Sequence, residues 1–184
     1  MLGKSDFPEE VRLPKINPRM SAISQSPRIV VVLHNIRSLH NVGSIFRTSD
    51  GAGVEKIYLC GITPAPIDRL GVIRKEVAKV ALGAERTVPW EHAARTAPRL
   101  ARLAREGWHL LAVEQSRDAK NLWKALPRLR KKSKLAVVLG AEVKGLPPSV
   151  LRAADEVLEI PMCGTKESLN VSVAAGVALF ALRG

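Results

Sequence analysis

Short apolar runs alternate with amphipathic stretches along most of this chain. Runs rich in Val, Ile and Leu that are bounded by glycine, proline or charged residues indicate buried strands, and apolar residues spaced by three and four indicate helices. The pattern predicts strands at residues 29–33, 57–60, 86–90, 108–113, 135–139 and 156–160. It predicts helices from 42 to about 52, at 72–81, 93–105 and 121–126, and beginning near 147 and 169. This alternation predicts an α/β fold with a mainly parallel sheet and helices on both faces.

Two glycine-containing loops follow the last two predicted strands. Gly140 ends the run at residues 135–139, Pro161 ends the run at 156–160, and a loop that contains Gly164 leads into the last helix. Open α/β sheets bind ligands at the carboxyl ends of their strands. We therefore predict one ligand pocket between these two loops, although each glycine taken alone is better explained by ordinary turn geometry.

The first residues differ from the rest of the chain. Residues 1–27 contain scattered charges and prolines without periodicity, which predicts an irregular N-terminal arm, followed by a single domain over residues 28–184. The opening stretch is charged and interrupted by prolines, so we do not expect a signal peptide.

Composition and charge narrow the classes of function. The chain has 184 residues, of which 46% are hydrophobic, enough for one core. Its 29 Lys and Arg residues against 17 Asp and Glu residues give a net charge of +12. Such a surface favours a polyanion such as RNA, although solubility alone also explains a basic protein. The low aromatic content, 4%, argues against an extended platform for base stacking, and no apolar run is long enough to span a membrane.

Several kinds of chemistry are disfavoured by what the sequence contains. Cys60 and Cys163 are too few for a disulfide framework or a zinc site, and we expect free thiols in a reducing cytoplasm. The four histidines show no ligand spacing, so no metal site is expected. Residues 164–166 lack the order of a phosphate-binding loop, and no Gly-x-Gly-x-x-Gly motif of a nicotinamide-binding fold occurs.

Four segments resemble one known family. They are H-N-V-G-S-I-F-R-T at residues 40–48, G-A-E-V-K-G-L at 140–146, I-P-M at 160–162 and S-L-N-V-S-V-A at 168–174. From about Ile29 to the C-terminus, the chain resembles the SpoU (TrmH-like) family of the SPOUT superfamily, which are RNA 2′-O-ribose methyltransferases. The resemblance implies S-adenosylmethionine as the methyl donor, a homodimer, and a trefoil knot at the C-terminal end, over residues 135–182. Nothing in the periodicity could reveal such a knot.

The resemblance also implies the residues of the site. Those expected to bind the cofactor are Val113, Leu139, Gly140, Gly145, Ile160, Met162, Ser168 and Leu169. Those expected to act in catalysis are Arg47, Asn41, Glu142, Ser168 and Asn170. Each has a simpler alternative: a solvated surface residue for the two charged ones, and a helix cap for the others.

Arg47 is expected on the acceptor side of the reaction. In the family, the matching arginine is proposed to activate the ribose 2′-hydroxyl. A guanidinium is a poor base, so we expect it to bind a phosphate beside the target ribose and to stabilise the developing alkoxide. Asn41 is expected either to cap its helix or to help place Arg47, and Glu142 to orient Arg47 or the ribose.

The predicted function is methylation of a ribose 2′-hydroxyl, with tRNA as the first substrate class and rRNA as the second. The arm is too short for an additional RNA-binding domain, so substrate selection is expected to rest on the arm and on the basic surface of the domain. Two alternatives stay open at this point: methylation of an RNA base, and a non-catalytic RNA-binding or ribosome-assembly protein.

Overall fold

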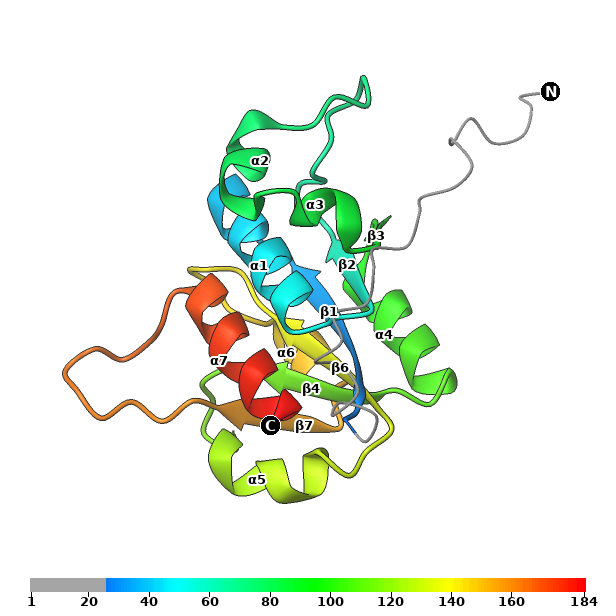
Figure 1. Cartoon of the computed structure of the whole chain (residues 1–184). Helices are drawn as coiled ribbons and strands as arrows, with labels where there is room; N and C mark the ends of the chain where they lie inside the picture. Colours follow the sequence, from blue (N-terminus) through cyan, green and yellow to red (C-terminus); the bar gives the residue numbers. More distant parts are fainter. Residues whose placement is uncertain (1–25) are drawn as a thin grey trace.

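The computed structural model of the chain describes residues 26–184 (Figure 1). The irregular arm predicted for residues 1–27 therefore lies, up to residue 25, outside the described residues. The strands are β1 (Arg28–His34), β2 (Lys56–Cys60), β3 (Trp90–Ala93), β4 (His109–Val113), β5 (Lys120–Asn121), β6 (Lys134–Leu139) and β7 (Glu156–Glu159).

The strands form a single sheet in the order β3-β2-β1-β6-β4-β7-β5, and each neighbouring pair is parallel. The central strands β1 and β6 are almost continuous runs of buried apolar residues, as expected where both faces of a parallel sheet are covered. Strand β6 lies between β1 and β4, both of which precede it in the sequence. The predicted parallel sheet is confirmed, and the knot implied by the family resemblance stays a prediction.

Helices cover both faces of the sheet. They are α1 (Leu39–Gly51), α2 (Lys75–Ala81), α3 (Ala84–Thr87), α4 (Thr96–Arg105), α5 (Leu122–Leu129), α6 (Pro148–Leu151) and α7 (Val171–Arg183). Alternate residues of β1 divide between two cores. Val31 belongs to the core that includes residues of α1, α2, α3, α5 and α7, whereas Val32 belongs to the core that includes residues of α4 and α6. Figure 1 shows α1 and α7 side by side over the face of the sheet to which Val31 belongs. Among residues 26–184, no helix is long and apolar enough to cross a membrane.

One predicted helix cap is wrong. The side chain of Ser38 accepts the hydrogen bond of the Asn41 backbone amide, so Ser38, not Asn41, is the N-cap of α1. Asn41 lies inside the first turn of α1. Its side chain is consequently available for contacts outside the helix.

The strand predicted at residues 86–90 is also wrong at its start. Leu82 and Gly83 adopt left-handed backbone conformations after α2, and the chain then forms the short helix α3. The carboxylate of Glu85 accepts a hydrogen bond from the backbone amide of Gly83, which supports this turn. Strand β3 begins only at Trp90, where pairing with Ile57 of β2 starts.

Candidate active site

A pocket of about 480 Å³ lies at the carboxyl ends of β4, β6 and β7. This volume falls in the range of small-molecule and cofactor sites. The three strands are neighbours, with Val113 of β4 opposite Leu139 of β6 and Leu158 of β7. All eight residues predicted to bind the cofactor line this pocket: Val113, Leu139, Gly140, Gly145, Ile160, Met162, Ser168 and Leu169.

Three segments form the walls of the pocket: the first follows β4, the second is the loop after β6, and the third is the loop between β7 and α7. The second wall depends on two glycines that lie against each other. A Cβ atom on Gly140 would lie 2.6 Å from the backbone carbon of Gly145 and 2.7 Å from the backbone nitrogen of Leu146. These neighbours are backbone atoms, so a side chain at residue 140 would displace the loop. Gly145 itself has a φ of 60°, and its amide donates to the carbonyl of Ala141 at 2.9 Å. The loop therefore requires glycine at both positions.

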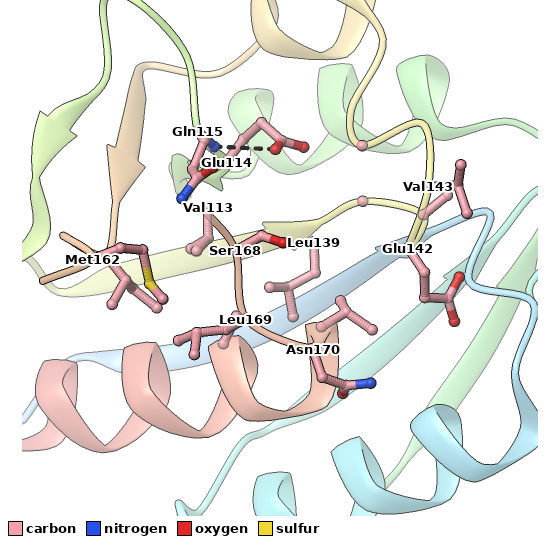
Figure 2. A pocket seen from close by; sticks show the side chains of 16 residues that line it. Val113, Glu114, Gln115, Leu139, Glu142, Val143, Met162, Ser168, Leu169 and Asn170 are labelled. Atoms are coloured by element: carbon pink, nitrogen blue, oxygen red, sulfur yellow. Dashed lines mark hydrogen bonds between the residues drawn. The ribbon is translucent and has the colours of Figure 1, made fainter. Parts of the chain in front are cut away.

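Glu114, in the segment after β4, holds that segment to the loop after β6. One carboxylate oxygen accepts from the backbone amide of Leu146 at 2.8 Å, and the other accepts from the backbone amide of Gln115 at 3.0 Å. Figure 2 shows Glu114 and Gln115 directly beyond Val113. The side chain of Gln115 donates to the backbone carbonyl of Glu167, in the loop between β7 and α7. The pair thus connects all three segments that surround the pocket.

Sequence reasoning missed Glu114 and Gln115 as pocket residues. They directly follow Val113, which was expected to end a strand beside the pocket. The rule that ligands bind beyond the carboxyl ends of parallel strands could have identified them. The other lining residues that were missed are Ala141, Val143, Val171 and Ala174.

Glu142, Asn41 and Asn170 form a chain of hydrogen bonds at one end of the pocket. The Asn41 nitrogen Nδ2 donates to Oε1 of Glu142 at 2.9 Å, and Nδ2 of Asn170 donates to Oδ1 of Asn41 at 3.2 Å. In Figure 2, Glu142 and Asn170 lie at one end of the pocket and Met162 at the other. Three of the five predicted catalytic residues are therefore brought together by β6, α1 and α7.

Glu142 is kept ionised by its surroundings. Partial burial acts to raise its pKa, but hydrogen bonds from the side chain of Asn41 and from the backbone amides of Glu142 itself, Arg37 and Ser38 outweigh burial and lower the pKa. The contacts from the amides of Arg37 and Ser38 each measure 3.4 Å. At neutral pH, this carboxylate is an acceptor of hydrogen bonds and not an acid.

The remaining two predicted catalytic residues differ in position. Ser168 lines the pocket and is not a helix cap, since Asn170 is the N-cap of α7 and accepts from the amide of Ser172 at 2.8 Å. Arg47 is exposed on α1 and does not line the pocket. It follows Asn41 by six residues, which in an α-helix is about 9 Å along the axis and a rotation of about 120° to another face.

The two cysteines take no part in this site. Cys60 is buried at the end of β2, and burial raises its pKa to about 11, so its thiol is not an active nucleophile. Cys163 is exposed in the loop before α7 and does not line the pocket. Within the part of the chain that the structure describes, no cluster of His, Cys, Asp and Glu side chains is arranged to hold a metal ion.

The model of the SpoU rRNA Methylase family matches residues 28–180. The chain belongs to this family. The family predicted from the four motifs is thereby confirmed. In this SpoU chain, the three motifs that lie at or beyond Gly140 supply two walls of the pocket, and the motif at residues 40–48 supplies Asn41.

Similar relatives have been named for their RNA substrates. The 23S rRNA (guanosine-2'-O-)-methyltransferase RlmB of Ralstonia nicotianae is 36% identical over 157 residues, which cover 85% of this chain and 58% of that protein. The RlmB of Vibrio cholerae is 33% identical over 154 residues, covering 83% of this chain and 57% of that protein. The chain thus spans somewhat more than half the length of these relatives.

Solved structures share the fold. An AdoMet-bound rRNA methyltransferase from Sinorhizobium meliloti superimposes with a TM-score of 0.75 at 27% identity, covering 86% of this chain and 56% of that one. A TrmH/SpoU tRNA modifying enzyme from A. aeolicus has a TM-score of 0.71 at 25% identity, covering 90% of this chain and 81% of that one.

Proposed function

We propose that this chain transfers a methyl group from S-adenosylmethionine to a ribose 2′-hydroxyl of RNA. The observation that carries the proposal is the pocket at three strand ends, with the Glu142, Asn41 and Asn170 chain at one end of it. We place rRNA first among substrates, since the RlmB relatives are named for 23S rRNA, and tRNA second. This reverses the order predicted from the sequence.

The pocket has the composition that an adenosine with an amino-acid tail requires. Apolar side chains of Leu139, Ile160, Met162 and Leu169 offer surface to a purine, and the glycine loop at residues 140–145 lets backbone groups approach the ligand closely. S-Adenosylmethionine supplies a methyl group that is already activated by its sulfonium. The protein must then position the acceptor and accommodate its proton.

Glu142 and Arg47 are proposed to act on the acceptor ribose. The ionised Glu142 accepts the hydrogen bond of the 2′-hydroxyl, directs an oxygen lone pair towards the methyl group, and takes up the hydroxyl proton as the oxygen–methyl bond forms. Asn41 and Asn170 fix the orientation of that carboxylate. Arg47 binds the neighbouring phosphate and stabilises negative charge that develops on the oxygen.

We further propose that the chain works as a homodimer in which Arg47 serves the pocket of the second copy. Three apolar side chains stand exposed along α7 and the residue pair before it: Leu169 is 36%, Val173 50% and Phe180 54% exposed. Val173 and Phe180 are seven residues apart and so lie on one face of α7, whereas Leu169 precedes the helix and also lines the pocket. Phe180 lies beside Gly51 of α1, so this face continues towards the exposed stripe of α1 that carries Arg47. A second copy on this face would cover the apolar side chains and receive Arg47.

Residues 28–184 are proposed to form the methyltransferase domain, acting in the cytoplasm, with residues 1–27 as an arm. The net charge of +12 supports binding to RNA through phosphates. Affinity for RNA is therefore expected to fall steeply as salt is raised.

The test compares RNA from cells with and without this protein. Ribosomal and transfer RNA are digested, and their nucleosides are measured by mass spectrometry. Loss of one 2′-O-methyl nucleoside supports the proposal. Loss of a base-methylated nucleoside would instead identify a base methyltransferase, and an unchanged pattern with intact cofactor binding would identify a non-catalytic RNA-binding protein.

A further inference from the structure

Among residues 26–184, two acidic residues and no basic residue line the pocket. Glu114 and Glu142 line it, and the other lining residues are apolar or neutral. This composition is opposite to that of the whole chain, which has 29 Lys and Arg residues and a net charge of +12. The lining of the pocket is therefore acidic although the chain as a whole is basic.

Both carboxylates are fixed by neutral donors. Glu114 accepts from the backbone amides of Leu146 and Gln115, and Glu142 accepts from the side chain of Asn41 and from backbone amides. Within residues 26–184, neither carboxylate forms an ion pair with a lysine, arginine or histidine. Neutral donors hold the negative charge in place without cancelling it, so the two carboxylates contribute a negative potential at the pocket.

Methyl transfer changes the charge of the cofactor. S-Adenosylmethionine has a positive sulfonium, and when the sulfur–methyl bond breaks, its electron pair stays on sulfur and leaves the neutral thioether of S-adenosylhomocysteine. The ammonium and carboxylate of the amino-acid tail are the same before and after transfer. Only the sulfur centre therefore responds differently to the potential of the pocket.

We infer that Glu114 and Glu142 make this pocket select the sulfonium form of the cofactor over its thioether product. The inference rests on the proposed function, because it concerns the same ligand in the same pocket. Its consequence is that the attraction which holds the cofactor weakens at the moment of transfer. Product release is thus favoured by the reaction itself.

The inference is tested by calorimetric titration of the whole chain with three ligands. S-Adenosylmethionine has the sulfonium, S-adenosylhomocysteine lacks it, and sinefungin replaces it with a carbon that bears a cationic amine. At a partly exposed site, one unit of charge near two carboxylates is expected to give about three- to tenfold tighter binding. We expect S-adenosylmethionine and sinefungin both to bind more tightly than S-adenosylhomocysteine by this factor.

Charge-neutral variants identify the source of the selectivity. Glu114→Gln and Glu142→Gln keep a carbonyl acceptor and remove the charge, so each is expected to lower the ratio of affinities, and the double variant to bring it close to one. Glu76→Gln, on the exposed face of α2, removes the same charge away from the pocket and should leave the ratio unchanged. If Glu114→Gln fails to fold, Glu142→Gln alone still tests the ratio.

The outcomes separate the inference from the function on which it rests. Equal binding of all three ligands, or tighter binding of S-adenosylhomocysteine, overturns the inference and leaves the proposed function standing. Glutamine variants that weaken all three ligands equally show a purely structural role and also overturn it. If none of the three ligands binds, the proposed function fails and the inference fails with it.

Discussion

Asn41 donates a hydrogen bond to Glu142 across 101 residues of sequence, from Nδ2 to Oε1 at 2.9 Å. Its amide oxygen at the same time accepts from Asn170. Because one end of the amide donates and the other accepts, both contacts require the same orientation of the Asn41 side chain. A single amide thus ties the start of α1 to the loops beyond β6 and β7.

Asn41→Asp should separate chemistry from cofactor binding. Aspartate has no donor for Glu142 and places a second carboxylate against it, which raises the pKa of Glu142 and disorders the acceptor end. We expect the rate of methyl transfer to fall about 100-fold, with affinity for S-adenosylmethionine within about twofold of the original. Asn121→Asp is the matched control, since Asn121 caps α5 through its side-chain oxygen, which aspartate retains. A normal rate for Asn41→Asp would show that the Asn41 amide is not needed to orient Glu142 for methyl transfer.

Gly140→Ala should weaken cofactor binding because the new methyl group meets the backbone of residues 145 and 146. We expect affinity for S-adenosylmethionine to fall at least about tenfold, measured by calorimetry, while the circular dichroism spectrum stays that of a folded α/β protein. Gly164→Ala supplies the control in a neighbouring loop, since a Cβ there meets no atom within 4 Å. Equal losses in the two variants would contradict the close packing of the glycine loop.

Arg47→Ala and Gly140→Ala together test the dimer and the role of Arg47. With S-adenosylmethionine kept well below the dissociation constant of Gly140→Ala, each variant alone should show little transfer, because the first lacks the guanidinium and the second binds the cofactor weakly. Arg47→Lys should also stay impaired if the planar guanidinium binds its target with two hydrogen bonds. If Arg47 serves the pocket of the second copy, each mixed dimer contains one complete site.

Mixing the two inactive variants in equal amounts, with exchange of subunits, should then restore about a quarter of the original activity. Sedimentation of the same samples should show a dimer, and Phe180→Glu should shift it to the monomer by placing a charge on the exposed α7 face. Mixtures that stay inactive while heterodimers form would assign Arg47 to its own pocket or to no site.

The pattern of apolar residues was sufficient to predict the parallel sheet, because β1, β4 and β6 are nearly continuous buried runs. The glycine-containing loops at the strand ends predicted where the pocket lies, and the family resemblance supplied the residues expected to line it. The pattern did not predict the correct cap of α1, where two nearby residues could each fill the N-cap position. Ser38 and Asn41 are both good caps, and only the structure shows that Ser38 takes the cap and leaves Asn41 for Glu142.

Contacts between segments that are distant in the sequence could not be predicted from the pattern of residues either. Glu114 gives no local signal of its role, since it holds the loop at Leu146, which is 32 residues away. The helix α3 depends on the left-handed conformations of Leu82 and Gly83, and leucine rarely adopts such a conformation. Periodicity alone therefore placed a strand there.

Glu156 should make the stability of the fold depend on pH in the acid range. Hydrogen bonds from Arg128 lower its pKa from 4.5 to about 2; burial opposes this, and His109 adds to it with a contact of 2.8 Å. Because the folded pKa is depressed, this stabilisation is fully present above about pH 4.5 and is lost as the pH falls towards 2.

Glu156→Gln is therefore expected to lower the free energy of unfolding by about 2 kcal/mol at pH 7. In urea unfolding from pH 7 to pH 3, the difference from the original chain should shrink below about pH 4.5. Glu55→Gln, which breaks the exposed pair with Arg28, should cost less than about 1 kcal/mol. A difference for Glu156→Gln that does not change with pH would show that its charge is irrelevant.

The most direct test of ribose methylation uses S-adenosylmethionine with a trideuterated methyl group. The purified protein is incubated with rRNA from cells that lack it, and the RNA is digested and measured by mass spectrometry. We predict one 2′-O-methyl nucleoside that carries three deuterium atoms on its ribose, and its absence when Glu142→Gln replaces the original protein. A trideuterated methyl group on a base, or no transfer from a cofactor that binds, would contradict it.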